Sequence, residues 1–221
     1  MTAFSFSRVR FAVCLLLAFG LSLTASVAQD QLRGDAPDDW LIQNATVLTV
    51  TNGTIENGDV LVRDGDIAAV GPDLSVPSGV ATYDASGEYV MPGIIEAHQH
   101  MAISNVNEAT NQVTAEVGVG DVLDPFDIGV YRALAGGVTT AHVMHGSANP
   151  IGGRNETIKL RYGVTNPQAL KMDGAPRTIK FALGENPTGL YGQGRDQVPA
   201  TRMGVEHVIR EALREAERYM D

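Results

Sequence analysis

The apolar pattern of the chain changes near residue 90, and this change constrains the fold more than any other feature. From Trp40 to Val90, short β-branched runs such as LIQNATVLTV are cut by Asn52-Gly53, Asn57-Gly58 and Asp64-Gly65. Such pairs favour tight hairpin turns, because they accept the positive φ that these turns require. The pattern predicts a small antiparallel β module over residues 40–90.

Beyond Met91, apolar strand candidates alternate with longer stretches that have room for helices. The strand candidates are GIIEAHQH, GVTTAHVMH, TIKLRY and TIKFALG. The clearest helix is TRMGVEHVIREALREAERYM, in which Thr201 can act as the cap and apolar residues recur at helical spacing from Val205 to Ala216. Repeating β and α units predict an α/β domain with a parallel sheet or barrel over residues 91–221.

The first 28 residues have the composition of a secretory signal peptide. Arg8 and Arg10 precede an apolar core that begins at Phe11, and small residues up to Ala28 offer a cleavage site. The apolar run is shorter than the roughly 20 residues of a membrane helix, so an uncleaved anchor is the less favoured alternative. We expect export to the periplasm or the medium after cleavage near Ala28, no stable membrane insertion, and a polar linker over residues 29–39.

Charge and cysteine content exclude several classes of protein. The chain carries 16 basic and 26 acidic residues, a formal charge of −10 that disfavours nucleic acids and anionic membranes as partners. Its single cysteine, Cys14, lies within the predicted signal peptide. A mature chain without cysteine has no disulfide scaffold and no thiolate ligand, so any metal must be held by nitrogen and oxygen.

His98 and His100 are the sharpest chemical feature. Residues two apart in a strand point to the same face, so both imidazoles and the side chain of Glu96 are expected on one side. Two neutral imidazoles side by side supply half of a ligand set for zinc or a similar divalent ion. For the pair alone, two surface or hydrogen-bonded histidines on a strand are the alternative.

The segment MPGIIEAHQHM, which follows the β module, resembles the entry strand of the amidohydrolase superfamily. The resemblance continues through ALAGGVTTAHVMHGSANPIGG, TIKLRYG, IKFALGENP and PATRMGVEHVIREA, and so covers nearly all of the chain from Leu41 onward. These segments look like the imidazolonepropionase-related branch, which also holds metal-dependent dipeptidases and prolidase-like enzymes. The resemblance implies a small N-terminal β-sandwich module followed by a (β/α)8 TIM-like barrel. The family usually has aspartate where this chain has Glu96, which affects geometry more than the capacity to bind metal.

Many members of this family bridge two metals with a carboxylated lysine at the end of the fourth barrel strand. Strand order assigns this role to Lys180, because the alternation of side chains along its strand places it toward the barrel interior. Lys159 alternates in the same way one strand earlier and is the alternative, and an ordinary ion pair at a strand end is the third possibility for each lysine. Carbamate formation needs a neutral amine, which burial and nearby cations can supply by lowering a lysine pKa.

His142 and His145 follow the predicted second strand, at the face where barrel enzymes build their sites. Together with Asn149 they are candidate substrate-binding residues, and the alternative is that these polar side chains order the loop. Gly152-Gly153 gives a flexible backbone but lacks the spacing and the lysine of a phosphate-binding loop.

A complete (β/α)8 barrel needs about 250 residues, so residues 91–221 have room for roughly its first four units. In the family, two further metal-binding histidines and the aspartate that takes a proton from water come from later strands. We therefore expect a truncated N-terminal portion, inactive by itself, with the catalytic aspartate beyond the C-terminus. Half a barrel exposes sheet edges and an apolar interior, which favours pairing with a partner, a homo-oligomer included.

The function that the resemblance implies is hydrolysis of a carbon–nitrogen bond in a non-peptide amide, a cyclic amide or a dipeptide. One or two divalent metals would activate the attacking water. Zinc suits nitrogen and oxygen ligands, as do manganese, iron and cobalt. The alternatives are a non-catalytic domain that keeps the β module and half-barrel as a binding or assembly surface, and an enzyme assembled from two separately encoded halves.

Overall fold

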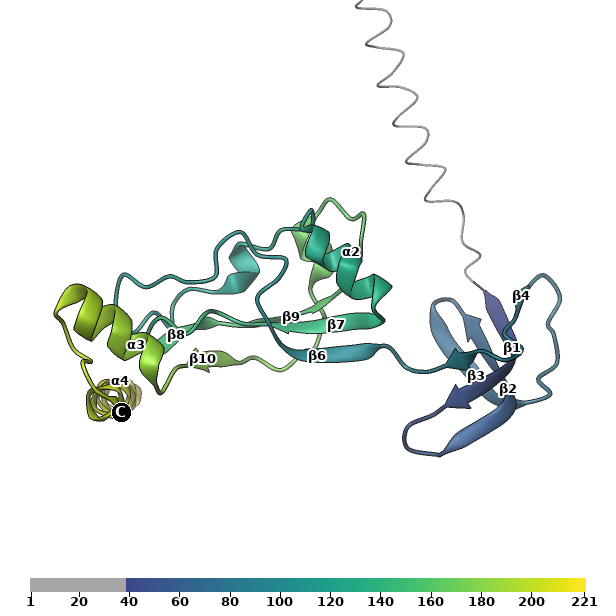
Figure 1. Cartoon of the computed structure of the whole chain (residues 1–221), viewed down its shortest axis with the longest axis horizontal. Helices are drawn as coiled ribbons and strands as arrows, with labels where there is room; N and C mark the ends of the chain where they lie inside the picture. The colour runs from purple at the N-terminus through teal and green to yellow at the C-terminus, as the bar shows by residue number, and fades with distance from the viewer. Residues whose placement is uncertain (1–38) are drawn as a thin grey trace, which may run out of the picture. The chain divides into compact units, whose positions relative to one another are not determined.

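The structure, a computed structural model, describes residues 39–221 (Figure 1). The predicted signal peptide and nearly all of the predicted linker lie outside the described residues. The described chain forms two compact units, the first ending at Pro92 and the second beginning at Gly93. Within residues 39–221, no helix is both long and apolar enough to cross a membrane.

The first unit is one five-stranded sheet built around β1. Its strands are β1 (Trp40–Leu48), β2 (Thr54–Arg63), β3 (Asp66–Pro72), β4 (Ala81–Asp84) and β5 (Tyr89–Val90). Neighbours in the order β3-β2-β1 are antiparallel, as predicted, whereas β4 and β5 both pair with β1 in parallel. The prediction of a purely antiparallel module is therefore wrong for these last two strands. After β3 the chain crosses back to β1, so β4 and β5 run in the same direction as β1. The predicted second layer of a sandwich stays a prediction.

Two of the three predicted turns lie between strands of this sheet. Asp64 and Gly65 have φ of 52° and 80° between β2 and β3, and Gly53 has φ of 82° between β1 and β2. The third pair lies within β2, where Asn57 has φ of 50° and the register with β1 shifts. The turn prediction is wrong there, because a β-bulge uses the same positive φ as a hairpin turn.

The second unit opens with a β-α-β arrangement. β6 (Ile94–Gln99) and β7 (Val138–Val143) pair in parallel, and α2 (Ile128–Ala135) lies between them in the sequence. The Asp127 carboxylate caps α2 by accepting from the backbone N–H of Gly129, and it also accepts from that of Ala102, both at 2.7 Å. This part of the predicted parallel sheet is confirmed.

The later strands depart from the predicted parallel order. β9 (Glu156–Lys159) pairs antiparallel with β7, and β8 (Ile151–Arg154) pairs antiparallel with β10 (Ile179–Phe181) in a separate sheet. The reason is that no helix lies between β7 and β9, and parallel neighbours need a long crossover connection. The α/β class is therefore observed, whereas the half-barrel stays a prediction.

The remaining elements are helical. They are the 3₁₀ turns η1 (Val119–Asp121) and η2 (Pro167–Leu170), α3 (Glu185–Thr188) with the π-helical turn η3 (Gly189–Gln193), and α4 (Arg202–Met220). The Thr201 hydroxyl caps α4 by accepting from the backbone N–H of Gly204 at 3.3 Å, as predicted. Of the predicted apolar stripe on α4, Val205 is buried and Leu213 is exposed.

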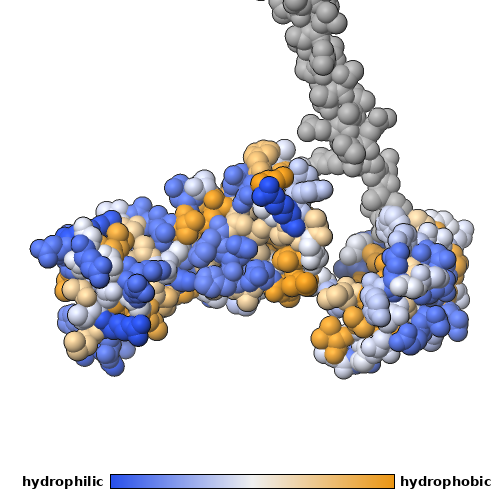
Figure 2. All heavy atoms as spheres, viewed as in Figure 1, coloured by the Kyte–Doolittle hydropathy of each residue, from blue (hydrophilic) through white to orange (hydrophobic). Residues whose placement is uncertain are grey.

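Each unit has its own buried core and also exposes large apolar side chains. The core of the second unit joins β7, β9 and α2 through Ala141, Val143, Ile158 and Val130. In Figure 2, orange apolar patches interrupt the blue polar surface. β7, which this core buries, pairs with β6, whose carboxyl-terminal end carries the histidines described next.

Candidate metal centre

The two histidines of the His-x-His motif meet at the carboxyl end of β6. The Nε2 atoms of His98 and His100 lie 3.3 Å apart, and their rings are nearly perpendicular, with an interplanar angle of 78°. The Glu96 carboxylate accepts from the backbone N–H of His98 at 3.0 Å, which fixes the chain between them. The predicted convergence of the two imidazoles is therefore present in the structure.

The carbonyl of Met144 orients the ring of His100. His100 Nδ1 lies 2.8 Å from this oxygen. A carbonyl can only accept, so Nδ1 donates to it, and Nε2 is the ring nitrogen that faces His98. The pairing of β6 with the end of β7 holds Met144 in place, since its N–H donates to the Gln99 carbonyl at 2.8 Å. Metal-binding histidines usually have this kind of backbone support.

The spacing of the two Nε2 atoms suits a divalent cation. Two nitrogens bound to one tetrahedral zinc at roughly 2.0–2.1 Å lie roughly 3.3 Å apart. The observed separation of 3.3 Å equals this value. The donor set therefore fits the metal that the sequence implies.

Lys180 is the third member of this group. It is half-buried on β10, and its Nζ lies 3.7 Å from Met144 Sδ. The positive charge of Lys180 is the largest cause that lowers the pKa of His98, followed by burial and the charge of His100, against the carboxylate of Glu96, which raises it. A lowered pKa favours the neutral imidazole, the form that binds metals.

The alternative lysine lies elsewhere on the sheet. Lys159 is exposed on β9 and pairs with Thr140, toward the beginning of β7, whereas the histidines follow the end of β6. Among residues 39–221, no three histidine, cysteine, aspartate or glutamate side chains converge on one point. The described ligand candidates are therefore His98, His100 and Lys180.

His142, predicted to contact substrate, lies close enough to influence His98, yet its ring is already engaged. Its Nδ1 is 3.1 Å from Thr157 Oγ1, and its Nε2 is 2.9 Å from Thr178 Oγ1. Both nitrogens therefore have partners, one on the neighbouring strand β9 and one just before β10.

His145 and Asn149 are buried, with 2% and 0% of their surfaces exposed. His145 Nε2 accepts from the N–H of Glu108 at 2.8 Å, and its Nδ1 donates to the Gly146 carbonyl at 3.0 Å. The Asn149 amide donates to the Glu108 and Asn111 carbonyls at 2.8 and 3.0 Å. The structure assigns both side chains to holding the long connection after β6, which is the alternative role that the sequence allowed.

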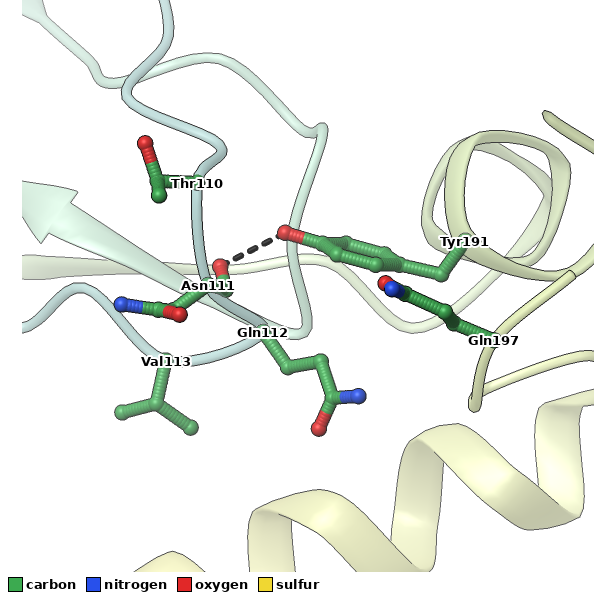
Figure 3. Close-up of a pocket in the computed structure, with 6 residues that line it drawn as sticks. All are labelled: Thr110, Asn111, Gln112, Val113, Tyr191 and Gln197. Atoms are coloured by element: carbon green, nitrogen blue, oxygen red, sulfur yellow. Dashed lines mark hydrogen bonds between the residues drawn. The ribbon is translucent and has the colours of Figure 1, made fainter. Parts of the chain in front are cut away.

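A separate polar hollow of about 430 Å³ lies between this connection and the helical segment around Tyr191 (Figure 3). The Tyr191 hydroxyl donates to the Asn111 carbonyl at 2.6 Å across it. Its lining residues are Thr110, Asn111, Gln112, Val113, Tyr191 and Gln197. No sequence pattern pointed to them, because they come from irregular segments far apart in the chain.

The chain resembles known proteins over most of its length. It is 34% identical to the amidohydrolase tasK of Hapsidospora irregularis in an alignment that covers 72% of this chain and 18% of that protein. The adenine deaminase of Edwardsiella ictaluri is 36% identical over 43% of this chain and 17% of its own length. A dihydropyrimidinase of Arabidopsis thaliana is 35% identical over 45% of this chain and 18% of its own length.

One solved structure matches both units. The amidohydrolase from Thermotoga maritima superposes with a TM-score of 0.75 at 38% identity, over 82% of this chain and 48% of that one. The chain thus spans less than half the length of each of these relatives. No protein-family model matches the chain.

Proposed function

We propose that this chain, a member of the amidohydrolase superfamily, provides part of the metal centre of a hydrolase that cleaves carbon–nitrogen bonds. Its homologues are amidohydrolases that act on such bonds. The substrate class that we propose is a small amide, a cyclic amide or a dipeptide. The chain spans 48% of the T. maritima amidohydrolase, so the activity and the substrates of a whole enzyme are part of this proposal.

The observation that carries the proposal is the meeting of the His98 and His100 Nε2 atoms, 3.3 Å apart, beside Lys180. Two hydrogen-bonded surface histidines would have a similar spacing, but they would need neither the carbonyl support of His100 nor a neighbouring amine. Together these features favour a cation site over the simpler reading of the motif.

In the proposed reaction, His98, His100 and Lys180, the last as its carbamate, would hold a divalent cation, with zinc as the first candidate and manganese, iron or cobalt as alternatives. When bound, such a cation polarises an amide carbonyl and lowers the pKa of water. The chain's own residues prepare this site. The Met144 carbonyl orients the His100 ring through Nδ1, and the charge of the free Lys180 amine lowers the pKa of His98.

The proposal also covers architecture and location. The similarity to the T. maritima structure supports the proposal that residues 91–221 form the opening part of a (β/α)8 barrel. The composition of residues 1–28 supports export. Both extend the proposed function, and neither is needed for the test that follows.

The test is zinc binding by the purified chain, measured by equilibrium dialysis with metal analysis. We expect the double variant His98→Ala/His100→Ala to lose the bound zinc. The matched control is His207→Ala, because His207 is exposed on α4. Equal binding by the wild-type chain and the double variant would contradict the proposal and favour a non-catalytic domain.

A further inference from the structure

The lysine of the proposed centre lies on a different sheet from its histidines. β10, which carries Lys180, pairs with β8, whereas β6 and β7 pair with each other and with β9. No strand of the described chain joins these two sheets through backbone pairing. The chain itself links the two sheets, because only Asn155 separates β8 from β9, and its backbone N–H donates to the Thr178 carbonyl at 3.0 Å. Side-chain contacts add to this link.

A run of side-chain hydrogen bonds crosses this gap. Asn155 Nδ2 donates to Thr178 Oγ1 at 2.9 Å, and Thr178 Oγ1 lies 2.9 Å from His142 Nε2. On the other side of the ring, His142 Nδ1 lies 3.1 Å from Thr157 Oγ1. The run thus connects β7 and β9 to Thr178, which is two residues before Lys180.

One backbone N–H fixes the direction of the first bond in this run. The His145 N–H can only donate, and it points to Asn155 Oδ1 at 3.0 Å, so the Asn155 amide presents its NH₂ group to Thr178. Thr178 Oγ1 accepts this bond and still has its own proton to give to His142 Nε2. In that arrangement, His142 Nε2 accepts and Nδ1 donates to Thr157.

We propose that His142 and Thr178 are positioning residues that hold Lys180 in register with His98 and His100. This inference rests on the proposed function for its role in metal binding, but its geometry does not depend on that function. It also gives His142 a role other than contact with substrate, since neither ring nitrogen is free. Side chains that orient ligands in this way typically change metal affinity about 10–100-fold when they are lost.

The test compares Thr178→Val with Thr178→Ser in the full chain. Valine keeps the β-branched shape and removes the hydroxyl, whereas serine keeps the hydroxyl. Thr157→Val removes the other partner of His142 and is the second variant if Thr178→Val does not fold, which circular dichroism shows. Two measurements need no metal: the ¹⁵N shifts of the His142 ring, and nuclear Overhauser contacts between the Met144 methyl and the Lys180 side chain.

In the wild-type chain and in Thr178→Ser, we expect Nε2 of His142 to lack a proton and the contact between Met144 and Lys180 to be present. In Thr178→Val, we expect mixed tautomers, a weakened contact, and zinc affinity lower by about 10–100-fold. A proton on Nε2 in the wild-type chain, or an unchanged contact in Thr178→Val, would overturn the inference. If the wild-type chain binds no zinc while the contact still depends on Thr178, the proposed function fails and the positioning role stands.

Discussion

Lys180 lowers the pKa of His98 more than any other group does, although the two residues lie on strands that belong to separate sheets. The amine and the imidazole are therefore brought together by tertiary structure. Lys159 is not among the groups that shift the pKa of His98, so the structure distinguishes the two lysines more clearly than the sequence pattern does.

The first prediction compares these two lysines. Lys180→Met should lower the zinc affinity of the chain by more than about 100-fold, since a lost ligand costs more than a lost supporting residue. Lys159→Met is the matched control and should leave affinity unchanged, because Lys159 is exposed on β9. Calorimetric titration measures both, and equal losses for the two variants would remove Lys180 from the ligand set. Added bicarbonate should raise zinc binding only while Lys180 is present, if the amine is carboxylated.

The second prediction concerns the packing of His145 on Gly152. A Cβ atom at Gly152 would lie 2.5 Å from His145 Nδ1, and the buried ring has no room to move away. Gly152→Ala should lower the free energy of unfolding of the second unit by about 1–3 kcal/mol. The helical circular dichroism signal reports this unit, because every described helix lies in it.

The control for that prediction is Gly189→Ala. Gly189 has helical φ and ψ of −66° and −48°, and a Cβ there would meet no atom within 4 Å. This substitution should be neutral or stabilise by about 0.4–1 kcal/mol. If both variants lose the same stability, close packing around His145 is not the cause.

The third prediction concerns the bulge in β2. A Cβ at Gly58 would lie 2.9 Å from Val47 Cγ2, so Gly58→Ala should destabilise the first unit by about 1–3 kcal/mol. The cost should be smaller when Val47→Ala has already removed the obstructing methyl group, which a double-mutant cycle measures. Trp40 is the only tryptophan, so its fluorescence during urea unfolding reports this unit. Additive costs would show that the two side chains do not meet.

The fourth prediction concerns the pH dependence of the same unit. Hydrogen bonds from the Ser86 hydroxyl and then the Asn44 amide lower the pKa of Asp84 below its usual 3.8. A carboxyl group with a lowered folded-state pKa stabilises the fold above its unfolded pKa and loses that contribution as the pH falls through the folded value.

Ser86→Ala should therefore raise the pKa of Asp84, as carboxyl ¹³C shifts measure. Its destabilising effect should be full above about pH 4 and should vanish once Asp84 is protonated in both proteins. Ser78→Ala, at an exposed serine of the same unit, is the control and should leave that pKa unchanged. A destabilisation by Ser86→Ala that persists in acid would point to a cause other than the charge of Asp84.

The sequence by itself determined the features that depend on neighbours along the chain. Positive φ at Asp64-Gly65, the Thr201 cap and the shared side of His98 and His100 all follow from interactions within a few residues. Such preferences are properties of short segments, so they can be predicted without knowing what packs against them. The change of pattern near residue 90 belongs to the same class.

Only the tertiary structure decided which strands pair and which polar groups meet. The antiparallel placement of β9 and β10, the burial of His145 against Gly152, and the engagement of both His142 nitrogens depend on contacts between distant segments. The alternation of side chains along a strand predicted that both Lys180 and Lys159 face the barrel interior. Alternation specifies the face of the sheet on which a side chain lies, but not the residues that it contacts. Long-range packing places the Lys180 amine where its charge lowers the pKa of His98.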